Sequence, residues 1–190
     1  MKLVFATHNE NKFREVKAQM PKHIELLSLT NIGCDEDIPE TADTIEGNAI
    51  LKAKYVKDTY GYDCFADDTG LEVPVLKNAP GVYSARYAGP EKDANANMDK
   101  LLTELDGNFA REARFKTAIA LTYKTDDVLF VGVCEGKITK TAIGKKGFGY
   151  DPIFRPDGFT ETFAEMDMAQ KTKIGHRGKA IAQLIEYLSV

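Results

Sequence analysis

An apolar run at 64–66 ends in two adjacent carboxylates, Asp67 and Asp68, which are followed by a hydroxyl, a glycine and a second apolar run. This order predicts a β-strand that ends by delivering two acids to a turn. Because neighbouring side chains of a strand point to opposite faces, Asp67 and Asp68 are expected to have different roles. A hard cation such as Mg²⁺, which prefers one or two carboxylates plus substrate phosphates, would relieve their repulsion. A solvated acidic turn is the alternative, and this stretch alone does not decide between the two.

Apolar residues at strand and helix spacing continue on both sides of this stretch. Strands are predicted at 2–6, 25–29, 73–76, 114–123, 128–135 and 137–143, and helices after Asn9, from Thr44 to a stop at Gly61, around 98–105 and over 181–188. The strands at 114–123 and 128–135 flank a turn and predict a β-hairpin. The order of elements argues for an α/β fold with a mixed sheet and packed helices, and the length argues for a single domain, 1–190.

Composition excludes several classes of protein. The net charge of −4, from 25 Lys and Arg against 29 Asp and Glu, gives no strong field toward nucleic acid or an anionic membrane. The three cysteines are isolated and form no CxxC pattern, which argues against a zinc site. Without an apolar run of about 18 residues or a signal-like start, no membrane span is expected and the cytoplasm is the predicted location.

The first predicted strand leads into a polar loop at 7–12 and then into a helix, with Asn9 as the expected N-cap. A strand, polar loop and helix in this order point backbone N–H groups at an anion. Lys12, one turn into the helix, would add a positive charge. The loop lacks the glycines of a P-loop, so a capped surface helix remains the alternative.

Two further residues depend on what lies near them. Glu40 ends an acidic loop at 33–40 and becomes a second metal ligand only if Asp68 is close; otherwise the loop is simply solvated. Lys52 lies on the helix that begins at Thr44. It is either a surface lysine or a second phosphate contact, depending on whether that helix borders a ligand site.

Two segments in the last third of the chain are candidates for ligand binding. The stretch 144–151 holds three glycines, two lysines and two aromatic residues, a mixture that favours a ligand loop over an ordinary surface loop. The most basic segment, 170–179, places His176 and Arg177 at the start of the last predicted helix. Cations there oppose the helix dipole, which points to a bound anion or a carbonyl-bearing base. A surface histidine is the alternative.

Several motifs together, in a fixed order, resemble one family. They are THNENK at 7–12, ADDTGL at 66–71, PGVYSARY at 80–87, FGYDP at 148–152 and GHRG at 175–178. The chain is similar along its whole length to the inosine triphosphate pyrophosphatases, which act on non-standard purine nucleotides. The resemblance implies hydrolysis of ITP, dITP and XTP to the monophosphate and pyrophosphate, which keeps deaminated purines out of DNA and RNA. It also implies a need for Mg²⁺, a homodimer, and an elongated mixed sheet between two lobes with the substrate in a central cleft.

The same resemblance assigns expected roles to individual residues. Asp68 corresponds to the catalytic carboxylate and metal ligand, and Glu40 to a second metal ligand. The expected triphosphate loop comprises Thr7, His8, Asn9, Glu10, Asn11 and Lys12. The other expected substrate contacts are Lys52, Thr69, Phe148, Gly149, Tyr150, Asp151, Lys171, His176 and Arg177, with Phe148 stacking on the purine. One departure is His8, where the family often has glycine.

In the implied mechanism, Asp68 accepts a proton from a water that attacks the α-phosphorus, while Lys12, Lys52 and Lys171 offset the charge on the phosphates. Three alternatives remain at this point. One is a related pyrophosphatase for modified pyrimidine or canonical nucleotides, and another is a nucleotide sensor without turnover. The third, an RNA-binding module, fits poorly with the net charge.

Overall fold

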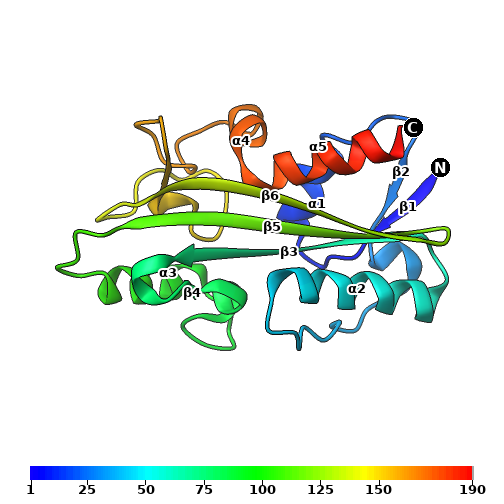
Figure 1. Cartoon of the computed structure of the whole chain (residues 1–190), viewed down its shortest axis with the longest axis horizontal. Helices are drawn as coiled ribbons and strands as arrows, with labels where there is room; N and C mark the ends of the chain where they lie inside the picture. The colour runs from blue at the N-terminus through cyan, green and yellow to red at the C-terminus, as the bar shows by residue number, and fades with distance from the viewer. Residues whose placement is uncertain (190) are drawn as a thin grey trace. The chain divides into compact units, whose positions relative to one another are not determined.

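The structure, a computed structural model, describes residues 1–189 (Figure 1). The strands are β1 Lys2–Phe5, β2 Glu25–Leu27, β3 Cys64–Val73, β4 Ala79–Pro80, β5 Glu112–Tyr123, β6 Asp126–Ile138 and β7 Phe154–Pro156. The α-helices are α1 Glu10–Lys17, α2 Ile45–Tyr60, α3 Ala94–Glu104, α4 Met168–Ile174 and α5 His176–Leu188. No helix among residues 1–189 has both the length and the apolar character needed to cross a membrane.

The strands form one mixed sheet in the order β2-β1-β3-β5-β6-β7, with β4 paired to β3. Strand β1 pairs in parallel with β2 and with β3, whereas β4 and β7 pair antiparallel with their neighbours. A short turn at Lys124 joins β5 to β6. The predicted α/β class, mixed sheet and β-hairpin are therefore confirmed.

Local signals explain why the first two helices begin and end where they do. The Asn9 side chain accepts hydrogen bonds from the backbone of Asn11 and Lys12, so it caps α1 as predicted. Thr44 caps α2 in the same way. Gly61 ends α2 with a φ of 74°, a left-handed conformation that glycine adopts without strain.

Three strand predictions differ most from the structure, while the strands predicted at 2–6 and 25–29 end slightly early, at Phe5 and Leu27. Strand β3 does not end before the two acids but runs through them to Val73, because Leu71 and Val73 continue its buried side and its end pairs with β4. The segment predicted as a strand at 73–76 forms a 3₁₀ turn at Pro74–Leu76, since proline has no N–H for a sheet. The strand predicted at 137–143 stops at Ile138, the end of β6.

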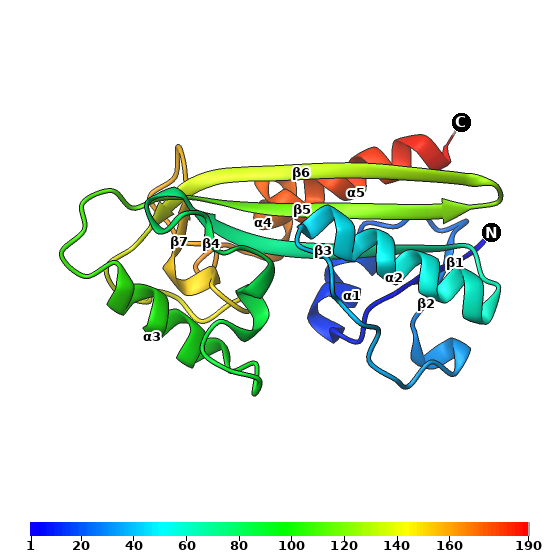
Figure 2. The ribbon, with the colours of Figure 1, turned by 60° about the horizontal axis from the view of Figure 1, so that its bottom comes forward.

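The chain divides into two compact units, each with its own core. The first unit comprises 1–68, 117–132 and the chain from Arg177 onward, which includes all of α5 except His176. Its core includes Phe5 and Phe65, whose rings stack with centroids 4.6 Å apart, together with Ile181 and Leu184 from α5. In this unit α2 and α5 cover opposite faces of the sheet (Figures 1 and 2).

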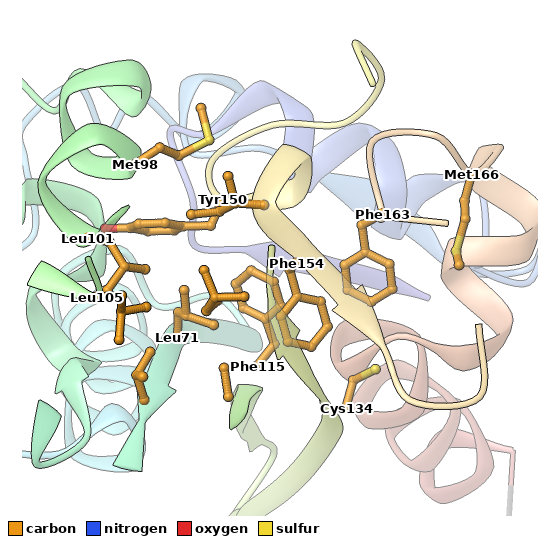
Figure 3. Packing of buried hydrophobic residues seen from close by; sticks show 14 residues of the cluster. Leu71, Met98, Leu101, Leu105, Phe115, Cys134, Tyr150, Phe154, Phe163 and Met166 are labelled. Carbon is orange, nitrogen blue, oxygen red and sulfur yellow. The ribbon is translucent and has the colours of Figure 1, made fainter. Parts of the chain in front are cut away.

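The second unit comprises 69–116 and 133–176. Figure 3 shows its core, in which aromatic rings from separate segments meet. The Phe115 ring lies 4.6 Å from Phe154 in an edge-on arrangement, and Phe154 lies 5.1 Å from Phe163. Leucines of α3 complete the cluster. The single-domain organisation predicted from chain length stays a prediction.

Candidate functional site

The two adjacent acids of β3 leave the strand on opposite sides, as strand geometry predicts. Asp67 forms ion pairs with Lys12 of α1 and Arg177 of α5. Asp68 instead faces Lys52 of α2. The two carboxylates therefore make their ion pairs in two groups of charges within the first unit, and the two groups act on one another's pKa values.

In the group around Asp68, the carboxylates of Glu40 and Asp68 both lie close to the ammonium of Lys52. The Nζ atom of Lys52 lies 2.6 Å from Oε1 of Glu40 and 3.8 Å from Oδ1 of Asp68. Burial raises the pKa of Asp68 above its usual value, although Lys52 and Lys12 act against that rise. Burial would lower the pKa of Lys52, but Asp68, Glu40 and Asp67 outweigh it and raise that pKa.

This arrangement fits a hard divalent cation. Glu40 and Asp68 converge on a single positive charge, and carboxylate oxygens are the ligands that Mg²⁺ prefers. Among residues 1–189 no group of three or more His, Cys, Asp or Glu side chains could hold a metal ion. Two carboxylates, together with water and substrate phosphates, form the usual set of ligands for Mg²⁺ in nucleotide enzymes.

The group around Asp67 is a buried network of ion pairs. Lys12 Nζ lies 3.2 Å from Asp67 Oδ1, and Arg177 Nε lies 3.1 Å from Asp67 Oδ2. Arg177 Nη1 reaches Glu15 Oε2 at 2.7 Å. Sequence reasoning missed Glu15, and the available signal was its position three residues after Lys12, which places both on one side of α1.

Electrostatics favour the charged forms of Asp67 and Arg177 in this network. Burial alone would raise the pKa of Asp67, but the charges of Lys12, Arg177 and Lys52 outweigh it and hold that pKa well below its usual value. Burial lowers the pKa of Lys12 despite its pairing with Asp67. Asp67 and Glu15 overcome the burial of Arg177 and raise its pKa.

Two side chains of the predicted phosphate loop, those of Thr7 and Asn9, bond to the backbone of the loop itself. Oδ1 of Asn9 accepts from the N–H groups of Asn11 at 3.0 Å and Lys12 at 3.1 Å. The hydroxyl of Thr7 accepts from the N–H of Asn9. Glu10 is exposed in the first turn of α1. Thr7 and Asn9 thus fix the backbone conformation of the loop and of the first turn of α1.

His8, where the family often has glycine, connects this loop to the acidic loop. Its Nε2 atom lies 3.0 Å from the backbone oxygen of Glu36. The carboxylate of Glu36 accepts hydrogen bonds from Tyr55 at 2.6 Å and Tyr60 at 2.8 Å, both on α2. These bonds lower the pKa of Glu36 to about 2. They fix the loop that carries Glu40 against α2.

The second unit gathers the predicted base-pocket residues around one carboxylate. Oδ2 of Asp151 accepts from the N–H of Phe148 at 2.9 Å and pairs with Nζ of Lys171 at 2.8 Å. The ammonium of Lys171 also lies 4.7 Å from the centre of the Phe148 ring. A side chain at Gly147 would collide with Asp151, so the close turn requires glycine there.

Two other predicted residues are set into the core of this unit. The His176 ring stacks on Phe115 with centroids 4.7 Å apart and is buried. The hydroxyl of Tyr150 donates to the backbone oxygen of Ser84 at 2.7 Å, and its ring packs in the core. The side chain of Tyr150 therefore serves packing within this unit. Gly149 adopts a φ of 61°.

The predicted site residues thus fall into two sets. The first unit holds the 7–12 loop, Glu40, Lys52, Asp68 and Arg177, and the second holds Thr69, Phe148, Gly149, Tyr150, Asp151, Lys171 and His176. Thr69, half-buried on β3, directly follows Asp68 in the chain. His176 directly precedes Arg177, so two of the four chain boundaries between the units, 68/69 and 176/177, each separate two neighbouring candidates.

Comparisons with known proteins agree along the whole chain. The model of the Ham1 family matches residues 3–187. The dITP/XTP pyrophosphatase of Christiangramia forsetii is 64% identical over 189 residues, covering 100% of both chains. That of Porphyromonas gingivalis is 50% identical, covering 98% of this chain and 97% of its own.

Solved structures give the same result. The Ham1 protein of Staphylococcus aureus superposes with a TM-score of 0.91 at 36% identity, covering 100% of this chain and 98% of that one. The HAM1 protein of Coxiella burnetii gives a TM-score of 0.92 at 36% identity, with the same coverage.

Proposed function

The chain belongs to the Ham1 family, and from this premise we propose that it hydrolyses the non-canonical purine nucleotides ITP, dITP and XTP to the nucleoside monophosphate and pyrophosphate. The family resemblance predicted from the motifs is confirmed. The observation within the molecule that carries the proposal is the meeting of Glu40 and Asp68 on Lys52, beside a network that contains Lys12. This combination of acids and buried cations suits hydrolysis of a polyphosphate.

Asp68 is the proposed catalytic base. Its buried carboxylate lies 3.8 Å from Lys52, in the group of charges that Glu40 completes, where it would accept the proton of an attacking water. As it takes the proton of a water molecule, that oxygen bonds to the α-phosphorus and the bond from the α-phosphorus to the bridging oxygen breaks. Pyrophosphate leaves with the bridging oxygen. Lys12 and Lys52 offset the negative charge that the phosphates gather during this step.

Mg²⁺ is the proposed cofactor, and Glu40 and Asp68 are the residues that would hold it. When bound, it would polarise phosphate oxygens and lower the pKa of an attacking water. Lys52 already occupies a position between these carboxylates and keeps them from repelling one another. Lys52 thus keeps the carboxylates of Glu40 and Asp68 close enough together for both to bind one cation.

The purine is proposed to bind in the second unit, over the segment 148–151. Phe148 offers a ring for stacking, and its orientation is supported by the contacts of Asp151 and Lys171. Donors there and at His176 would pair with a 6-oxo group. The 6-amino group of adenine would leave such donors unpaired, at a cost of about 1–3 kcal/mol for each buried group. Homodimer formation and a cytoplasmic location stay predictions.

A panel of nucleotides tests this proposal. We expect kcat/KM for ITP, dITP and XTP to exceed that for ATP by on the order of 100-fold, because the 6-amino group of adenine leaves the buried donors unpaired. Removal of Mg²⁺ with EDTA should abolish turnover, and adding Mg²⁺ back should restore it. Equal rates on ATP would contradict the selectivity, preference for a pyrimidine would favour the related pyrophosphatases, and binding without turnover would indicate a sensor.

A further inference from the structure

We propose that Glu15 is a positioning residue, which holds Lys12 in place for the substrate phosphates by acting through Arg177 and Asp67. This inference rests on the proposed function, since it gives Glu15 a part in binding the polyphosphate. The residues form a line of alternating charge within the first unit, and each of Glu15, Asp67 and Arg177 is at least nine-tenths buried.

The distances define how the line is connected. Arg177 is held from two sides, by Glu15 at 2.7 Å from Nη1 and by Asp67 at 3.1 Å from Nε. Asp67 in turn is shared, because its other oxygen lies 3.2 Å from Nζ of Lys12. Glu15 and Lys12 are connected a second time by the backbone of α1, on which they lie three residues apart.

Lys12 and Arg177 share the carboxylate of Asp67, and Arg177 also pairs with Glu15. The position of Lys12 therefore depends on Glu15. A buried guanidinium requires opposite charge, and removing one acid increases its demand on the other. Without the charge of Glu15, Arg177 would draw Asp67 more strongly, and the ion pair between Asp67 and Lys12 would weaken. Lys12 would then lose the contact with Asp67 that fixes its ammonium group.

The variant Glu15→Gln tests this, because it removes the charge and nearly preserves the shape. We expect KM for ITP to rise about tenfold, a size usual for members of one ion-pair network. We expect kcat to stay within about threefold of the wild-type value, since Lys12 would bind the phosphates equally well in the ground state and in the transition state. The matched control is Glu186→Gln, the same change at an exposed position of α5, which should leave both constants unaltered.

A double-mutant cycle separates positioning from general structural support. In a Lys12→Met background, Glu15→Gln should change KM by less than about twofold, because the residue through which it acts is gone. The same fold-increase in both backgrounds would overturn the proposal. If Glu15→Gln does not fold, Glu15→Asp takes its place in the cycle, with a smaller increase in KM that should again vanish beside Lys12→Met.

Binding of inorganic tripolyphosphate keeps this test independent of turnover. Calorimetry without Mg²⁺ should show weaker binding for Glu15→Gln than for the wild-type protein, and equally weak binding for Lys12→Met with or without the second change. Failure of the wild-type protein to hydrolyse ITP would refute the proposed function alone. Unchanged tripolyphosphate binding by Glu15→Gln would refute the role of Glu15 alone.

Discussion

Asp68→Asn is expected to lower kcat for ITP hydrolysis by on the order of 10³-fold, since an amide can neither accept the proton of water nor serve as a charged ligand. The side chain lies at the one place where Glu40, Lys52 and a β3 carboxylate meet. Asparagine fills the same volume, so the fold should be retained. Steady-state kinetics at saturating ITP and Mg²⁺, with a thermal unfolding curve for each protein, measure both effects.

The matched control for this change is Asp37→Asn, which makes the same substitution in the exposed acidic loop. It should leave kcat unaltered. Full ITP hydrolysis by Asp68→Asn at saturating Mg²⁺ would show that the assigned role of Asp68 is wrong.

Asp67→Asn is expected to act on stability and to reduce the free energy of unfolding by about 3–5 kcal/mol, the usual cost of removing one partner from a buried ion pair. The change takes a shared acid away from Lys12 and Arg177 and leaves both charges buried. Urea denaturation at neutral pH measures this loss. A change of less than about 1 kcal/mol, the size usual for an exposed pair, would contradict the account of the network.

The pH dependence of this loss follows from the pKa of Asp67. Lys12 and Arg177 hold that pKa in the folded protein below the usual aspartate value of 3.8, against the opposing effect of burial. The stabilisation is therefore fully present above about pH 3.8 and is lost as the pH falls toward the lower folded value. The stability difference between the wild-type protein and Asp67→Asn should accordingly shrink below pH 3.8.

The elements predicted most closely are those with local signals. Asn9 and Thr44 begin helices through their own side chains, and Gly61 ends one through its φ angle, so a short window of sequence contains the whole reason. The β5–β6 hairpin likewise follows from two alternating runs around a turn. Both kinds of signal work because the interacting groups are close along the chain.

The limits of β3 could not be predicted in the same way. Polar residues in the middle of a strand indicate a turn when the sequence is read locally, yet both acids lie inside β3 and are buried. They are tolerated there because cations from three helices reach them. The compensation comes from tertiary structure and has no local signature.

The ion-pair partners of the site residues likewise could not be predicted from local sequence. Lys12 is 55 residues from Asp67 in the sequence, and Arg177 is 110 residues from Asp67 and 162 from Glu15. Motifs could indicate that Lys12 and Arg177 matter, but only the fold shows that both use one carboxylate. Glu15 lies outside the motif at 7–12, and its spacing from Lys12 alone does not show that it is buried against Arg177.

Hydrolysis of ITP in water enriched with ¹⁸O, followed by mass spectrometry of the products, tests the central claim most directly. If Asp68 activates a water that attacks the α-phosphorus, the label will appear in the phosphate of IMP, and unlabelled pyrophosphate will form in equal amount. Label in the pyrophosphate, or release of orthophosphate, would contradict the account.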